Sequence, residues 1–304
     1  MSADGHHLTE THLDIRPVAG RIGAEVAGVR LSHDLPEATI TAIEAALYRY
    51  KVLFFRDQGH LDDAGQEAFA ERLGEPVAHP TVPVADGSSY LLELDSQRGG
   101  RANAWHTDVT FVPDYPKASI LRAVTATASG GDTVWANTAE AYQRLPEALR
   151  TLADGLWALH TNAYDYAASR PAATAAQIER HRNVFASTVF ETEHPVVRIH
   201  PATGEPSLVL GQFVKGLLGF STADSRRIYD TLQEHVTRLE NTVRWRWRTG
   251  DVAIWDNQAT QHYAIDDYGD QRRVMRRVTL AGDIPIALDG RSSRTVRPAP
   301  QSEG

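Results

Sequence analysis

Cysteine is absent from the 304-residue sequence, which excludes disulfide bonds, thiolate metal ligands and a cysteine nucleophile. Long apolar runs are also absent, since no segment approaches the roughly 18 apolar residues of a membrane-spanning helix. The polar stretch from Met1 to Asp14 has no apolar core, so we do not expect a signal peptide there. These absences predict a cytoplasmic protein that does not bind membranes.

Basic residues are in the minority, with 31 Lys and Arg against 39 Asp and Glu and a formal net charge of -8. An acidic chain is a poor match for the phosphates of nucleic acid, so we expect no such partner. Val243, Trp245 and Trp247 alternate with arginines, which predicts a strand with its tryptophan face buried rather than a platform for bases.

Hydrophobic periodicity predicts a mainly β chain with flanking helices. Helical spacing of apolar residues occurs in residues 36–50, 62–73, 138–152 and 223–239. Short β-like segments occupy residues 15–26, 52–55, 90–94, 118–124, 133–136, 196–199, 207–210, 243–247 and 252–255. Many short strands with helices outside them favour a double-stranded β-helix, the jelly-roll architecture of cupins.

We predict a single domain over residues 1–290. Residues 163–190 are rich in alanine, contain Pro171 and fit neither period, so we interpret them as a partly helical, lid-like insertion. Residues 291–304, rich in serine, proline and arginine, are predicted to be a disordered tail.

His106 and Asp108 form a His-x-Asp pair, and on a β-strand they would point to the same face. A second imidazole, that of His262, would complete two histidines and one carboxylate on one face of a metal. This facial triad is typical of non-haem Fe(II) oxygenases and leaves coordination positions open. A His-x-Asp pair alone more often caps a turn and forms an ion pair. The interpretation as a metal site therefore needs support from further residues.

Four ordered stretches supply that support: residues 105–111, 130–133, 194–198 and 255–262. Together they resemble the taurine dioxygenase family of Fe(II)- and 2-oxoglutarate-dependent oxygenases over nearly the whole chain. Within that family, residues 156–162 and 264–268 look closest to the alkylsulfatase branch, which oxidises sulfate esters. The resemblance implies one catalytic domain, Fe(II) at the triad, and 2-oxoglutarate and O2 as cosubstrates.

The resemblance also implies residues that hold the cosubstrate. Arg273 would grip the distal carboxylate of 2-oxoglutarate, a role that suits a guanidinium because it binds carboxylates through two parallel hydrogen bonds. Thr133 would hydrogen-bond the same molecule. Arg277 would lie near the metal-bound end of the cosubstrate and the anionic head of the substrate. Strand alternation places Arg273 and Arg277 on one face.

The implied substrate contacts are His79 for the anionic group and Val109, Phe213 and Tyr166 for the rest of the pocket. Each of these residues could instead have a purely structural role, as a loop histidine or as a core side chain.

Two departures bear on the substrate. Ala102 and Val82 stand where taurine enzymes carry an asparagine and a tyrosine. Unpaired polar groups are costly to bury, so the loss of both polar side chains favours a substrate with a longer apolar tail than taurine.

We therefore expect an enzyme that hydroxylates the carbon next to the sulfate of an alkyl sulfate ester, releasing aldehyde and sulfate with succinate and CO2. The main alternative is the same chemistry on a taurine-like sulfonate or on a biosynthetic amino-acid-like or fatty-acyl substrate. A zinc hydrolase or a non-catalytic metal-binding protein would also use the triad, but neither requires Arg273 and Thr133. Relatives form dimers or tetramers, so the resemblance implies a homodimer or homotetramer.

Overall fold

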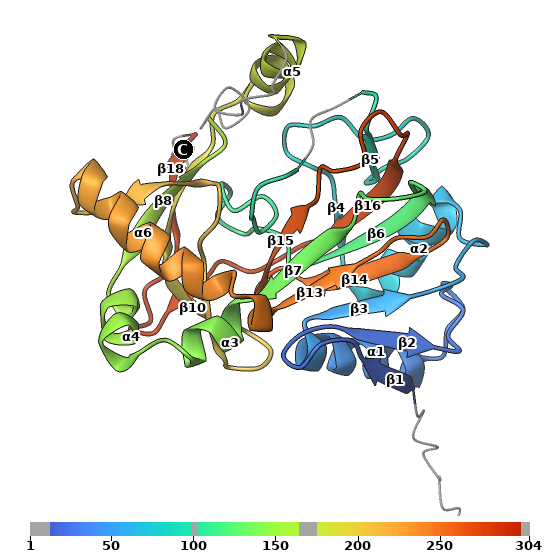
Figure 1. Ribbon diagram of the computed structural model, residues 1–304, viewed down its shortest axis with the longest axis horizontal. Coiled ribbons are helices and arrows are strands. Elements are labelled where there is room, and N and C mark those ends of the chain that lie inside the picture. Colours follow the sequence, from blue (N-terminus) through green and yellow to red (C-terminus); the bar gives the residue numbers. More distant parts are fainter. Residues whose placement is uncertain (1–12, 99–101, 164–174, 299–304) are drawn as a thin grey trace, which may run out of the picture.

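The largest layer is an eight-stranded sheet (Figure 1). The computed structural model describes residues 13–98, 102–163 and 175–298. Along the sheet the strands are β1 (Asp14–Pro17), β2 (Ala24–Ala27), β3 (Val52–Phe55), β14 (Val252–Asp256), β6 (Ala118–Thr125), β16 (Val274–Leu280) and β4 (Pro76–Val77), with β5 (Leu92–Asp95) also paired to β16. Its pairs are antiparallel except β2 with β3.

Three smaller sheets complete the β-structure. They are β13 (Thr242–Trp245) with β7 (Thr133–Asn137) and β15 (Thr260–Ala264); β12 (Val214–Leu217) with β8 (Trp157–Thr161), β9 (Glu191–Pro195) and β18 (Arg294–Arg297); and β11 (Pro206–Leu208) with β10 (Val197–Ile199) and β17 (Ile286–Ala287). The prediction of a mainly β chain is confirmed.

An aromatic core lies between the large sheet and the sheet of β13, β7 and β15. Trp135 of β7 and Trp245 of β13 pack against Phe54 of β3 and Trp255 of β14. The rings of Phe54 and Trp245 stack with centroids 4.0 Å apart, an arrangement that contributes roughly 0.5–1.5 kcal/mol beyond the area buried. Trp245 and Trp247 are buried while the arginines that alternate with them are exposed, as predicted.

Helices cover the outer surfaces. α1 (Glu37–Tyr50) and α2 (Asp63–Leu73) pack on the large sheet through a second apolar core, and α3 (Thr138–Gln143), α4 (Glu147–Asp154) and α6 (Thr222–Val236) pack around a third. The predicted helix over residues 138–152 is two helices, because Pro146 lacks the backbone N–H that would continue α3. Among the described helices, none is long and apolar enough to cross a membrane.

The insertion is helical in its described second half. Helix α5 (Ala175–Arg180) and the π-helical turn η1 (His181–Phe185) precede β9, and α5 stands away from the sheets in Figure 1. A short 3-10 helix, η2 (Leu239–Asn241), links α6 to β13.

The prediction of a disordered tail from residue 291 is wrong for residues 294–297. These residues form β18, which pairs antiparallel with β9. Arg294 and Arg297 lie within ion-pair distance of Glu193 and Glu191 on β9. The arginines that made this segment look like a solvated tail are therefore matched by acidic side chains on the neighbouring strand. Residues 299–304 lie outside the described part of the chain.

Candidate metal centre and its surroundings

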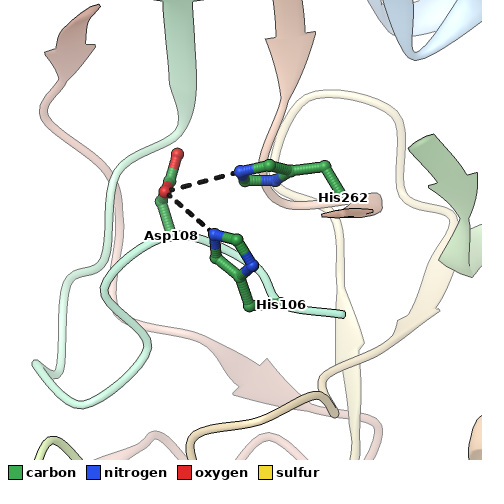
Figure 2. A group of neighbouring side chains, drawn as sticks. All are labelled: His106, Asp108 and His262. Carbon is green, nitrogen blue, oxygen red and sulfur yellow. Dashed lines mark ion pairs between the residues drawn. The ribbon is translucent and has the colours of Figure 1, made fainter. Parts of the chain in front are cut away.

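Three buried side chains, His106, Asp108 and His262, converge on one point (Figure 2). The Nε2 atoms of His106 and His262 each lie 3.8 Å from Oδ1 of Asp108. One ligand atom from each of the three residues lies within 4.8 Å of the others. Two imidazoles and a carboxylate at this spacing can bind one transition-metal ion and leave its opposite face open.

The backbone brings the two histidines together by a single antiparallel bridge. The amide of His106 donates to the carbonyl of His262 at 3.0 Å, and the amide of His262 donates back at 2.7 Å. Asp108 is not on a strand, contrary to the premise of strand alternation, but begins a turn. In that turn Val109 has a φ of 60°, which is rare for a β-branched residue. The turn, rather than the period of a strand, brings the carboxylate beside the imidazoles.

The ring nitrogens of both histidines suit a metal. Nδ1 of His106 lies 2.8 Å from the carbonyl oxygen of Ala104, so it carries the proton and leaves the lone pair on Nε2. Burial and the neighbouring His106 lower the pKa of His262 well below its ordinary value. His262 is therefore a neutral imidazole, the form that binds metals, and both histidines turn Nε2 toward the carboxylate of Asp108.

A chain of buried hydrogen bonds orients the carboxylate of Asp108. Its Oδ2 accepts from the hydroxyl of Ser119 at 2.8 Å, whose oxygen accepts from the amide of Asn257 at 2.8 Å. Asn257 in turn accepts from the indole N–H of Trp255 at 2.8 Å. The stretch 255–257, noticed in the sequence only as a family motif, thus holds a metal ligand in place. Ser119 had no sequence signal at all.

Arg277 also binds Asp108, with Nη1 donating to Oδ1. Burial raises the pKa of the Asp108 carboxyl, but the charge of Arg277, with the hydrogen bond from Ser119 acting in the same direction, holds the pKa well below its usual range. The Nε of Arg277 is buried with no hydrogen-bond partner among the described residues. One nitrogen of this guanidinium fixes the metal ligand, and another remains able to bind a ligand.

Arg273 and Thr133 lie together, as the resemblance implied. The Nε of Arg273 donates to the carbonyl of Gly131 at 3.1 Å, and Nη2 lies 3.5 Å from the hydroxyl oxygen of Thr133. That oxygen also accepts from the indole N–H of Trp247 at 2.9 Å. Gly131 has a φ of 70°, and a Cβ there would come within 3.3 Å of the Arg273 side chain. This close approach requires glycine and fixes the course of the arginine.

The guanidinium of Arg273 is buried, and no carboxylate of the described residues pairs with it. Burial lowers its pKa, yet a guanidinium stays protonated in proteins. A buried cation without an anion costs free energy that a bound anion recovers. Thr133 lies two residues before Trp135, which is paired across the sheet with His262. Thr133, which lies beside the unpaired guanidinium, is therefore only two residues along β7 from the position opposite the metal ligand His262.

His79 is a half-buried neighbour of the site. Its Nδ1 accepts from the backbone amides of Thr81 at 3.2 Å and Val82 at 3.1 Å. Burial and the charge of Arg277 lower the pKa of His79 to about 3. The ring is thus neutral, and its remaining proton is on Nε2.

Apolar side chains form one wall beside the metal ligands. Val109, Phe111 and Phe213 make up a buried cluster on which Val112, Phe185 and Phe190 also pack. The ring of Phe213 lies 6.2 Å from that of His106, and the ring of His79 lies 6.3 Å from Phe111. The structure therefore places His79, Val109 and Phe213 beside the site, and their contact with a substrate stays a prediction. Tyr166 lies outside the described residues.

Nothing in the sequence had singled out Phe111 and Phe185. Phe111 lies in the family-like stretch 105–111, which assigns it no role, and Phe185 lies in a segment without clear periodicity.

Comparison with known proteins agrees with this geometry. The family model described as "Taurine catabolism dioxygenase TauD, TfdA family" matches residues 14–279. An alpha-ketoglutarate-dependent sulfate ester dioxygenase of Pseudomonas putida is 68% identical over 94% of this chain and 95% of its own length. An alkylsulfatase of Acinetobacter baylyi is 56% identical over 94% of this chain and 90% of its own.

The fold agrees as well. The crystal structure of a taurine dioxygenase from Burkholderia xenovorans superposes with a TM-score of 0.79 at 38% identity, covering 93% of this chain and 96% of that one. This likeness confirms the predicted jelly-roll architecture, and the family match confirms the resemblance seen in the motifs. The chain belongs to the TauD, TfdA family of taurine catabolism dioxygenases.

Proposed function

We propose that the chain is an Fe(II)- and 2-oxoglutarate-dependent dioxygenase that cleaves alkyl sulfate esters by hydroxylating the carbon next to the sulfate. Two imidazoles and a carboxylate on one side of an ion support iron, because they leave the remaining positions to cosubstrates. Bound there, Fe(II) with 2-oxoglutarate and O2 supplies the oxidant that replaces a C–H hydrogen by hydroxyl, and 2-oxoglutarate leaves as succinate and CO2.

The single observation that carries this proposal is the buried, unpaired guanidinium of Arg273 close to the triad. A dicarboxylate with one end at the metal would bring its distal carboxylate to this charge. Thr133 supports the same role, because its hydroxyl oxygen already accepts from Trp247 and its proton is left to donate. A zinc hydrolase or a passive metal-binding protein gives no reason for such a charge.

The sulfate head would be held by His79 and Arg277. The neutral ring of His79 offers an N–H at Nε2, because its Nδ1 is occupied by two backbone amides. The free Nε of Arg277 offers a second donor with positive charge. Both relatives of high identity carry names that refer to sulfate esters, and donors of this kind suit a tetrahedral anion.

The apolar wall supports an alkyl tail rather than the amine of taurine. Val109, Phe111 and Phe213 offer no hydrogen-bonding group to an ammonium. Ala102 and Val82 add none from their side chains. A charged amine placed there would lose its hydration without replacement.

The chemistry of release follows from where the hydroxyl is placed. Hydroxylation of the carbon that bears the sulfate puts a hydroxyl and a sulfate on one carbon. The C–O bond to sulfate then breaks as the hydroxyl loses its proton, which gives an aldehyde and free sulfate. Donors from His79 and Arg277 stabilise the negative charge that the leaving sulfate gains.

The test is to supply the purified protein with Fe(II), 2-oxoglutarate, O2 and octyl sulfate, and to measure succinate and sulfate together. We expect equal amounts of both, and much less succinate when taurine replaces octyl sulfate. Succinate formed with taurine and none with octyl sulfate would rule out the sulfate-ester substrate. Sulfate released without O2 would instead indicate hydrolysis.

A further inference from the structure

We infer that Phe185 is a specificity-determining residue that contacts the alkyl chain of the substrate, and that Asn162 is the positioning residue that holds it at the site. This inference rests on the proposed function. It gives a role to the π-helical turn η1 and to the end of β8, which the chemistry described above does not use.

The ring of Phe185 reaches both halves of the site. It lies 5.7 Å from the ring of His79 and 5.5 Å from that of Phe111. It is also nearly parallel to Phe213, with centroids 6.2 Å apart, and Phe213 in turn contacts the ring of His106. One side chain of the insertion therefore lies between the residue proposed to hold the sulfate and an aromatic ring against a metal ligand.

Asn162 fixes the backbone that carries this ring. Asn162 is fully buried, and its amide nitrogen donates to the carbonyls of Phe185 at 3.0 Å and Thr188 at 2.7 Å. Its side-chain oxygen accepts from the amide of Phe190 at 2.8 Å. Three hydrogen bonds from one side chain thus tie residues 185–190 to the end of β8. A buried amide with both ends satisfied specifies one position for the segment.

The turn that presents Phe185 is itself unusual. Residues 181–185 form a π-helical turn, a conformation that is rare and frequent at functional sites. Phe185 is only half-buried, unlike Phe111 and Phe213. A side chain that packs on the cluster and still faces outward is placed to meet a ligand that enters from solvent.

The alkyl chain must pass this ring if the sulfate and the reacting carbon occupy the metal end. With the sulfate held by His79 and Arg277, the remaining methylenes extend along the wall that Phe185 and Phe111 share. Each methylene that becomes buried raises kcat/KM about fourfold. The dependence of kcat/KM on chain length therefore reports contact with the wall.

The test compares Phe185→Ala with the wild-type protein on ethyl, butyl, hexyl and octyl sulfate, scored by sulfate release. We expect kcat/KM to fall about tenfold or more on octyl sulfate and to change little on ethyl sulfate, so that the slope with chain length flattens. Phe185→Leu, which keeps an apolar side chain, should give an intermediate slope and guards against misfolding of the alanine variant. Asn162→Ala should raise KM for long chains more than for short ones.

Phe220→Ala is the matched control, because Phe220 is an aromatic side chain 40% exposed just before α6. It should leave the slope unchanged. An equal loss on every chain length in Phe185→Ala and Phe185→Leu, or no loss at all, would overturn the inference while leaving the proposed function intact. If the wild-type protein releases sulfate from none of the esters, the proposed function fails and this inference with it.

Discussion

The two ends of the site are built by different means. At the metal end, polar atoms of Asp108 and His106 are held by hydrogen bonds to Ser119 of β6 and Arg277 of β16, two neighbouring strands of the large sheet, and to the carbonyl of Ala104 in a loop. At the substrate end, the side chains of Phe111, Phe185 and Phe213 meet through contacts between their rings, and one of the three comes from the insertion.

This difference suits the two tasks. Chemistry at a metal tolerates little displacement of its ligands, and a network of directional bonds supplies that precision. Apolar contacts are non-directional, so a wall of rings can change one member and keep its shape. A family built this way can vary its substrates while its cofactor chemistry stays constant.

Loss of the carboxylate ligand should have the largest effect. Asp108→Ala removes one of three metal donors and leaves the charge of Arg277 buried without its partner. We expect no measurable binding of Mn(II) by calorimetry and no succinate formation. Asp114→Ala, an exposed change in the same loop, should bind Mn(II) as the wild-type protein does. Undiminished Mn(II) affinity in Asp108→Ala would show that the triad is not the metal site.

Replacement of the unpaired cation should come next. Arg273→Ala removes the charge proposed to bind the distal carboxylate, and a hydrogen bond to a charged group contributes about 1.5–3 kcal/mol. The KM for 2-oxoglutarate should therefore rise roughly 10- to 100-fold, with Mn(II) affinity in the absence of 2-oxoglutarate unchanged. Arg272→Ala, one residue earlier and exposed, serves as the control. An equal rise in both variants would argue against a specific role for Arg273.

The metal end was also the more predictable end. Few functions other than binding a metal and an anion would require two histidines, an aspartate and an arginine together. The order of His106, Asp108, His262 and Arg273 along the chain therefore indicated the family before any fold was known. The turn at Asp108 was not foreseen, because a single β-bridge leaves no alternating pattern.

Other features left no readable pattern in the sequence. Ser119 is an ordinary serine in a strand, and only the fold places it beside a carboxylate. Phe185 depends on a π-helical turn that matches neither the helix nor the strand period. Local composition does not predict β18, because its arginines pair with glutamates of β9, about 100 residues earlier in the chain.

A smaller effect should follow from breaking the network behind the metal ligand. Ser119→Ala removes the donor to Oδ2 of Asp108 and leaves the amide of Asn257 without its acceptor. Loss of such outer hydrogen bonds lowers metal affinity about 10-fold or slightly more. The measurement is Mn(II) titration of Ser119→Ala against Ser187→Ala, an exposed serine in the insertion. Equal affinities would mean that Arg277 alone suffices to orient the carboxylate.

The smallest effect is expected at His194, whose contacts form the joint between the metal end and the substrate end. His194 of β9 lies 2.8 Å from the carbonyl of Thr110 through Nε2 and 2.6 Å from the hydroxyl of Ser293 through Nδ1. The ring of His160 lies 4.9 Å away. These contacts connect the turn that carries Asp108 to the strands that border the insertion.

Burial and the nearby charge of Arg198 lower the pKa of His194 to about 3, although its bond to Thr110 opposes them. The unfolded chain binds a proton on this histidine below about pH 6.5, whereas the folded protein does not until about pH 3. Stability from the neutral ring is therefore complete above pH 6.5 and is lost as the pH falls toward 3.

His194→Gln keeps a hydrogen-bonding side chain and removes this titration. Between pH 7 and pH 6 its free energy of unfolding should fall less than that of the wild-type protein, by under about 1 kcal/mol. Urea unfolding at both pH values measures the difference, with the exposed His33→Gln as reference. An identical pH dependence in His194→Gln and the wild-type protein would mean that the joint takes up a proton as readily when folded as when unfolded. In that case the turn at Asp108 would be less firmly packed than its hydrogen bonds indicate, and the contrast between a fixed metal end and an adaptable substrate end would weaken at the place where the two meet.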